Sequence, residues 1–254
     1  MSSLSAALTD SSIMLRRNLK HTLRNPLTVF NALLIPILVM LMFVKVFGGA
    51  FSVGEDYVDY ATPGMLVMGI SYGLGATATA VNDDMTKGII NRFKAMDVSR
   101  GAVLTGQVVV TTLRCLVADA AIVGVAFLMG FDPTASAMDW LAVFGLVVLL
   151  TVATSWLTVA VGLAAKTAES AGLAAVPLIL LPFLSSAFVP AETMGAGVRQ
   201  FAEYQPFTPI IETLRGLMVE DGPARSDAIA AVAWCVGLAL LGYVWALSTF
   251  KKRA

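Results

Sequence analysis

The sequence contains few of the side chains that usually catalyse reactions or bind metals. Charged residues make up only 13 % of its 254 positions, and it has one histidine, His21, and two cysteines, Cys115 and Cys235. The histidine lies in a basic N-terminal tail, which excludes H-E-x-x-H metallopeptidase chemistry and a histidine-based triad. The cysteines lie far apart in apolar runs, without C-x-x-C spacing. We therefore expect no metal site and no catalytic residues.

A phosphate-binding loop is also absent from the sequence. No G-x-x-x-x-G-K-[ST] motif occurs, and Lys87-Gly88 has the two residues in the wrong order, without the glycines that would cradle phosphates. Asp119 is the only acidic residue well inside an apolar run, so the chain of buried carboxylates expected of a proton-coupled pump is missing. We expect that the chain neither hydrolyses ATP alone nor binds a cofactor.

Apolar residues, in contrast, make up 57 % of the sequence, which is more than a soluble domain usually buries. A membrane-spanning helix needs about 20 mostly apolar residues. Six such runs occur, at residues 27–47, 61–81, 103–129, 140–164, 172–190 and 228–249. They are too long and too uniform for barrel strands. The sequence predicts an all-α integral membrane protein with one domain, in which residues 1–26 form an interfacial helix, 27–249 six transmembrane helices and 250–254 a tail.

Basic residues are unevenly distributed over the connections between these runs. Loops that stay in the cytoplasm carry an excess of Lys and Arg. Most of the 17 basic residues fall on one side, at Arg16, Arg17, Lys20, Arg24, Lys87, Arg92, Lys94, Arg100, Lys166, Lys251, Lys252 and Arg253. We therefore expect both termini in the cytoplasm and residues 188–209 outside.

The N-terminal tail has the pattern of an amphipathic helix. Over residues 4–24, leucines share one helical stripe, while Arg16, Arg17, Lys20 and Arg24 fall largely elsewhere. Such a helix would lie along the cytoplasmic membrane surface, with its leucines in the acyl boundary and its cations near anionic head groups. The alternative is a frayed basic tail that only sets the topology.

The connection over residues 82–101 has the pattern of a docking helix. Asp83 or Asp84 can cap its start, and apolar residues then recur at helical spacing with basic residues on other faces. This exposed apolar stripe is expected to bind another protein. The alternative is a short helix that packs back on this subunit. The residues assigned to docking are Met85, Gly88, Ile89, Arg92, Phe93 and Met96.

The second run contains small residues suited to helix packing. Pro63-Gly64 is expected to open its helix, and Gly69 and Gly73 form a G-x-x-x-G pair that allows close approach of helix backbones, within this subunit or between two.

The third run holds the two deepest ionisable residues, Arg114 and Asp119. A charge inside a membrane costs at least about 2.5 kcal/mol, so each needs a polar environment. Five residues of an ideal helix place them about 140° apart, which is poor for direct pairing. We expect each to find a partner on another helix, and they either line a translocation path or lock helices together.

The segment 188–209 follows a run that Pro177 and Pro182 are expected to kink or break. Pro190 ends that run. Residues 194–203 then have the pattern of a short amphipathic helix, which Pro206 stops. These features predict that the chain does not cross the membrane again at this point.

A second short helix is expected after Pro206, with Thr208 and Pro209 as its N-cap and first-turn pair. Glu212 and Arg215 lie three residues apart on its polar face and are expected to form an ion pair. Exchange of the two charges would then partly restore the activity that either single reversal reduces. Together the two short helices are expected to form a re-entrant cap on the outer side, as a gate or as a scaffold.

Three stretches resemble the permease subunits of ABC-2 type exporters, and most closely their daunorubicin-resistance-like branch. These stretches are YATPGM at 60–65, GIINRFKAM at 88–96 with Ser99-Arg100 and Gly106, and residues 188–209 continued through ETLRGL at 212–217. The resemblance covers essentially the whole chain. Two positions depart from the family pattern, since Asp97 and Gly195 stand where the family often has proline.

The resemblance implies a subunit of the bacterial plasma membrane that exports amphiphilic drugs, lipids or glycolipids. It also implies two separate ABC ATPase subunits, which bind ATP and Mg²⁺, and a second permease, either another copy or a paralogue. Membrane lipid is the surrounding partner, and nucleic acid is not expected. The alternatives are a secondary transporter, which would normally need more spans or intramembrane ion ligands, and a non-transporting membrane partner.

Overall fold

The computed structural model describes residues 26–50, 56–86, 100–220 and 222–253, and these residues form helices and connections without a strand. The α-helices are α2 (Pro26–Leu41), α3 (Tyr57–Thr86), α5 (Arg100–Leu128), α6 (Ala137–Ala164), α7 (Ala168–Leu180), α8 (Ala196–Tyr204), α9 (Phe207–Met218) and α10 (Arg225–Arg253). α2 continues as a π-helix, Met42–Phe47, and a 3₁₀ turn, Gly48–Ala50. Two further 3₁₀ turns are Leu181–Leu184 and Ala191–Thr193. The predicted all-α class is confirmed for this part of the chain.

Four of the described helices, α3, α5, α6 and α10, are long and apolar enough to cross a membrane. The first and fifth predicted runs form shorter apolar helical segments, over Leu34–Phe47 and Ala168–Leu184. The chain is therefore a multi-pass membrane protein by length and composition, while the number of six spans stays a prediction.

Two helix boundaries differ from those predicted. α3 begins at Tyr57, so Pro63 lies inside the helix and does not open it. The fifth run ends its α-helix at Leu180 instead of 190. A 3₁₀ turn that contains Pro182 begins at Leu181, and residues 185–190 are not helical. The expected break is thus confirmed, but it comes earlier than the end of the apolar run.

The helix ends are capped locally. Ser136 and Asp139 form a reciprocal capping box at the start of α6, and Thr167 and Ser170 form another at α7. α5 ends at Leu128, and Gly130 two residues later has a φ of +102°, which suits glycine.

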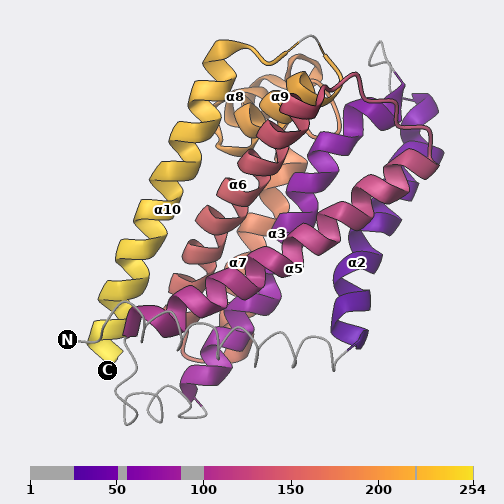
Figure 1. The fold of residues 1–254 in the computed structure, drawn as a ribbon. Coiled ribbons are helices and arrows are strands. Elements are labelled where there is room, and N and C mark those ends of the chain that lie inside the picture. The colour runs from indigo at the N-terminus through magenta and orange to yellow at the C-terminus, as the bar shows by residue number, and fades with distance from the viewer. Residues whose placement is uncertain (1–25, 51–55, 87–99, 221, 254) are drawn as a thin grey trace.

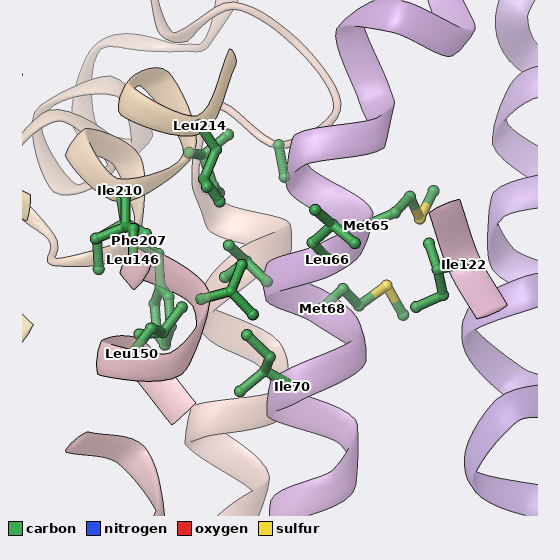
Figure 2. Close-up of a cluster of buried hydrophobic side chains, with 14 of the residues drawn as sticks. Met65, Leu66, Met68, Ile70, Ile122, Leu146, Leu150, Phe207, Ile210 and Leu214 are labelled. Carbon is green, nitrogen blue, oxygen red and sulfur yellow. The ribbon is translucent and has the colours of Figure 1, made fainter. Parts of the chain in front are cut away.

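The hydrophobic core lies between α3, α5, α6 and α9. Figure 2 shows side chains from these helices gathered around α3. Those labelled there are Met65, Leu66, Met68, Ile70, Ile122, Leu146, Leu150, Phe207, Ile210 and Leu214. A second cluster joins the last turns of α3 and α10 to α5 and α6 and includes Val81, Leu104, Trp156 and Phe250. The short helices α8 and α9 lie at the opposite end of the bundle from the end of α10 (Figure 1).

Glycines allow the closest contacts between the long helices. A Cβ on Gly242 of α10 would lie 2.6 Å from the backbone nitrogen of Leu157 on α6, and one on Gly162 of α6 would lie 2.6 Å from the carbonyl oxygen of Ala78 on α3. Small residues thus let these helix backbones approach in an apolar environment.

Candidate functional site

The docking segment is described only at its beginning. α3 continues to Thr86, so Asp83 and Asp84 lie in its last turn and do not cap a new helix, contrary to the prediction. Met85 also belongs to α3 and packs against the second cluster of this same subunit. Gly88, Ile89, Arg92, Phe93 and Met96 lie outside the described residues, as do Arg16, Arg17, Lys20 and Arg24 of the N-terminal helix.

The cytoplasmic end of α3, as predicted from the charge distribution, is attached to α6 by a buried amide. Asn82 donates hydrogen bonds from Nδ2 to the carbonyl oxygens of Gly162, at 3.1 Å, and Ala165, at 2.8 Å. These carbonyls lie in and just after the last turn of α6, where no intrahelical donor is available for the final groups. The last turns of α3, up to Thr86, are therefore held against the end of α6.

Arg114 connects α5 to α3. Its Nη2 donates to the carbonyl oxygen of Gly73, at 2.6 Å, and to Oγ1 of Thr77, at 2.8 Å. Thr77 in turn lies 3.1 Å from the hydroxyl oxygen of Thr111 on α5. The expectation that Arg114 finds its partner on another helix is confirmed. The contact favours a role in holding helices together.

Asp119 lies on the same side of α5, against α3, but does not pair with Arg114. A Cβ on Gly69 would lie 3.0 Å from Oδ1 of Asp119 and 2.6 Å from Cδ1 of Ile122. The residue is 5 % exposed, and neither carboxyl oxygen has a hydrogen-bond partner among the described residues. A partner for Asp119 on another helix was predicted and is not found in this part of the chain. The small-residue face of α3 packs within the subunit, against α5.

The predicted pair of short helices exists as α8 and α9. Pro190 precedes the 3₁₀ turn that leads to α8, and Pro206 occupies the N-cap position of α9. Thr208 was predicted to be the N-cap, but it lies with Pro209 inside the first turn, and its hydroxyl has no partner among the described residues. Proline at position 206 already has a φ suited to the start of a helix. The N-cap therefore lies two residues earlier in the chain than predicted.

The two short helices differ in burial. α8 leaves Val198 and Phe201 about half exposed and buries Ala202. On its polar side, Arg199 donates to Glu203 at 2.7 Å, and this carboxylate raises the pKa of Arg199. α9 is buried on nearly all sides, with Ile210, Ile211 and Leu214 fully covered. α9 is thus part of the core (Figure 2).

Glu212 and Arg215 form the predicted ion pair, with 2.6 Å between Oε2 and Nη1. Arg215, however, is only 3 % exposed and does not lie on a free polar face. Its Nη2 donates to the carbonyl oxygen of Ser186 at 2.8 Å, and its Nε and Nη2 lie 3.3 Å from that of Tyr60. The guanidinium also lies over the ring of Tyr60, 3.8 Å from its centre.

We call Arg215, Glu212, Tyr60 and Ser186 the Arg215 cluster. It joins α9, the first turn of α3 and the non-helical stretch after α7. The hydroxyl of Tyr60 donates to the carbonyl oxygen of Ser186, and nearby the hydroxyl of Tyr57 donates to that of Phe188, both at 2.9 Å. Sequence reasoning gave neither tyrosine a role, although Tyr60 begins the YATPGM stretch quoted above. Both lie next to an apolar run, where tyrosine is common in membrane proteins.

No group of three or more metal-binding side chains occurs within the described ranges. Three sets of polar contacts described above hold helices to one another: those of Asn82, those of Arg114 and those of the Arg215 cluster. α3 takes part in each of the three.

Known proteins similar to this chain cover most of its length. The family described as ABC-2 type transporter matches residues 9–219. A daunorubicin resistance ABC transporter permease protein of Streptomyces coeruleorubidus, DrrB1, is 29 % identical over 195 residues, which are 76 % of this chain and 69 % of the relative. A probable doxorubicin resistance ABC transporter permease protein of Mycobacterium tuberculosis, DrrC, is 25 % identical over 229 residues, 89 % of this chain and 82 % of the relative.

Proposed function

Because the chain belongs to the ABC-2 type transporter family, we propose that it is the permease subunit of an ATP-driven exporter of amphiphilic drugs, lipids or glycolipids. Members of this family are membrane subunits and not the ATPases, and the relatives are named permease proteins. The observation that carries the proposal is the family match over most of a multi-pass chain, from residue 9 to residue 219.

The energy comes from a separate pair of ABC ATPase subunits that bind ATP and Mg²⁺. They dock on the segment that follows Thr86, with Gly88, Ile89, Arg92, Phe93 and Met96 at the contact, and near the N-terminal surface helix. The apolar stripe of this segment and its basic surround support this assignment. Met85, the other residue assigned to this contact, is in the last turn of α3, where it is half-buried against the second cluster.

The helix α3 transmits the movement. It is one uninterrupted helix of 30 residues, about 45 Å long at 1.5 Å per residue. Asn82 fixes its last turns to α6, and Tyr60 in its first turn joins the Arg215 cluster. A displacement near Thr86 is therefore passed to α9 at the far end of the bundle as a rigid-body change.

The exported molecule is amphiphilic and enters from the cytoplasm or the inner leaflet. The names of the relatives, which are resistance proteins for daunorubicin and doxorubicin, support this class. A second permease, another copy or a paralogue, completes the pathway in the bacterial plasma membrane, with both termini of each in the cytoplasm.

The first experiment is purification of the chain from its own host membrane, followed by identification of the ABC ATPase that accompanies it. Simultaneous I89D and F93D substitutions are expected to abolish this co-purification while the chain still inserts into the membrane, because the apolar contact is lost. Tyr204→Asp is the matched control: Tyr204 is 78 % exposed on α8, at the other end of the bundle, and this variant should retain the ATPase.

Transport is then measured as uptake of daunorubicin into inverted membrane vesicles. ATP-dependent uptake that the double substitution removes supports the proposal. Uptake that follows an ion gradient without ATP would show a secondary transporter. Normal ATPase binding by the double variant would refute the docking assignment, and an absence of any ATPase and of uptake would show a non-transporting membrane partner.

A further inference from the structure

Asp119 is the one described acidic residue that is buried within the apolar part of the bundle and has no partner for either oxygen. It lies about two thirds of the way along α5, opposite Gly69 of α3. On one side Gly69 leaves room for its Oδ1, and Ile122 fills the next turn. An ionised carboxylate in this place would lack both water and a compensating donor, which proteins avoid by protonating the group.

The neighbouring elements supply no cation that could replace a proton. Arg114 is on the same helix but directs its Nη2 to Gly73 and Thr77. The helices packed against α5 are α2, α3 and α6. The other titratable side chains on α5, on these helices and on the π-helix that continues α2, outside the turn at Arg100, are Cys115, Tyr57, Asp59, Tyr60, Tyr72, Asp83, Asp84, Asp139 and Lys45. None of them has a hydrogen bond or ion pair to Asp119 within the described ranges.

We propose that Asp119 is a proton-binding site, present as a neutral carboxylic acid while α3 and α5 are packed and releasing its proton to water when these helices separate. The O–H bond breaks, the carboxylate keeps the electron pair and water accepts the proton. The inference concerns this chain alone and does not depend on the ATPase or on the exported molecule.

The helix contact that shields Asp119 depends on small residues. Gly73 faces Cys115, whose Sγ would lie 3.1 Å from a Cβ at that position, and Gly69 faces Asp119 in the same way. Since the contact is close and contains no side-chain bridge at Gly69, a small movement between α3 and α5 admits water to the carboxyl group. Proton release then opposes repacking, because the ionised group would have to be buried again. Acidic conditions consequently favour the packed arrangement and alkaline conditions the separated one.

The protonation state is tested by infrared spectroscopy of the full chain in lipid nanodiscs at neutral pH, with aspartate labelled at its side-chain carbon by ¹³C. We expect the carbonyl stretch of a protonated aspartic acid, shifted by the label, and we expect it to disappear in Asp119→Asn. Asp132→Asn, which changes an exposed residue in the connection after α5, should keep the band. Absence of the band in the unmodified chain, or its persistence in Asp119→Asn, would overturn the proposal.

The linked movement is tested through Cys115, which is 2 % exposed and lies one turn from Asp119. In a Cys235→Ala background, the rate of maleimide labelling at each pH is divided by the rate in the same chain carrying Asp119→Asn, whose side chain stays neutral. The division removes the thiol's own pH dependence. A charged Asp119 near Cys115 disfavours the reactive thiolate and would lower this ratio, so a rise of the ratio in alkali reports greater access to the thiol. The ratio should be near one in acid and rise several-fold in alkali.

Gly69→Ala serves as a positive control for this measurement. The added methyl group would lie 2.6 Å from Cδ1 of Ile122 and 3.0 Å from Oδ1 of Asp119, so these side-chain ends must move aside. The looser packing should speed the labelling of Cys115 at every pH. A ratio that stays constant with pH, in a chain whose Gly69→Ala variant labels faster, would refute the linkage between protonation and helix separation.

Discussion

At the scale of single residues, Arg215 makes the central polar contacts at the end of the bundle that carries α8 and α9. It was expected to pair with Glu212 on an exposed face, and the pair does form. Arg215 is buried, however, and its guanidinium also donates hydrogen bonds to the carbonyl oxygens of Tyr60 and Ser186. Its contribution to stability is therefore larger than that of an ion pair on an exposed face. Carbonyl oxygens are present at every residue, so the sequence carries no sign that these two would be the acceptors.

Replacement of Arg215 is expected to cost much more stability than replacement of its ion-pair partner. Arg215→Met removes the guanidinium donors to Glu212, Tyr60 and Ser186. Since a hydrogen bond from a charged group contributes about 1.5–3 kcal/mol, the free energy of unfolding should fall by about 3–5 kcal/mol. Glu212→Gln keeps the bonds to the carbonyl oxygens, and since Glu212 is partly exposed, its loss should be about 1 kcal/mol. Thermal unfolding of both variants in one detergent measures the difference, and equal losses would contradict the role of the carbonyl contacts.

The structure also revises the outcome expected for exchanging the two charges. A glutamate at position 215 has no N–H groups for the carbonyl oxygens of Tyr60 and Ser186, so the chain with both Glu212→Arg and Arg215→Glu should remain as impaired as Arg215→Glu alone. Daunorubicin uptake by inverted vesicles gives the comparison. Recovery in the exchanged chain would mean that the ion pair alone matters.

At the scale of helices, glycine positions decide which packing contacts are close. Gly242→Ala would place a methyl group against the backbone of α6 and should lower the free energy of unfolding by about 1–3 kcal/mol. Gly237→Ala, on the same helix, meets nothing within 4 Å and should be neutral or raise stability by up to about 1 kcal/mol. Thermal unfolding of the two variants checks this, and similar losses in both would exclude close packing of α10 on α6.

The apolar runs could be predicted from the sequence because their length reflects the membrane itself. The helix boundaries could not be predicted as well, because tertiary contacts move them. Pro63 suggested a start for α3, yet the helix begins at Tyr57, where both tyrosines near its start bond to residues more than 120 positions away. The position of Pro206, not the side chain of Thr208, determines the start of α9.

The depth of α9 was also beyond sequence reasoning. Its apolar positions predicted one buried face, and the same pattern suits a helix lying at a membrane surface. Only its neighbours show that it is covered, since Leu146 and Leu150 of α6 and Leu66 of α3 surround it. The second of the two short helices is therefore part of the core, while α8 stays largely exposed.

At the scale of the whole molecule, the polar contacts of α3 run from one end of the bundle to the other. Which of these two ends faces the cytoplasm can be measured by cysteine labelling. A single cysteine at Asp132, in the connection after α5, should react with a membrane-impermeant maleimide in intact cells. A cysteine at Lys166, between α6 and α7, should react only after permeabilisation. Both native residues are exposed. The reverse result would invert the predicted topology.

The Arg215 cluster also bears on how the chain folds during its synthesis. Tyr60 and Arg215 are 155 residues apart. α3 is therefore synthesised long before the contact between its first turn and Arg215 can form. At synthesis rates of about 5–20 residues per second, this delay is on the order of 10 s or more. During that time the helices already synthesised that can hold α3 are α2, α5, α6 and α7. A nascent chain that stops before α9 lacks Arg215, which secures the first turn of α3.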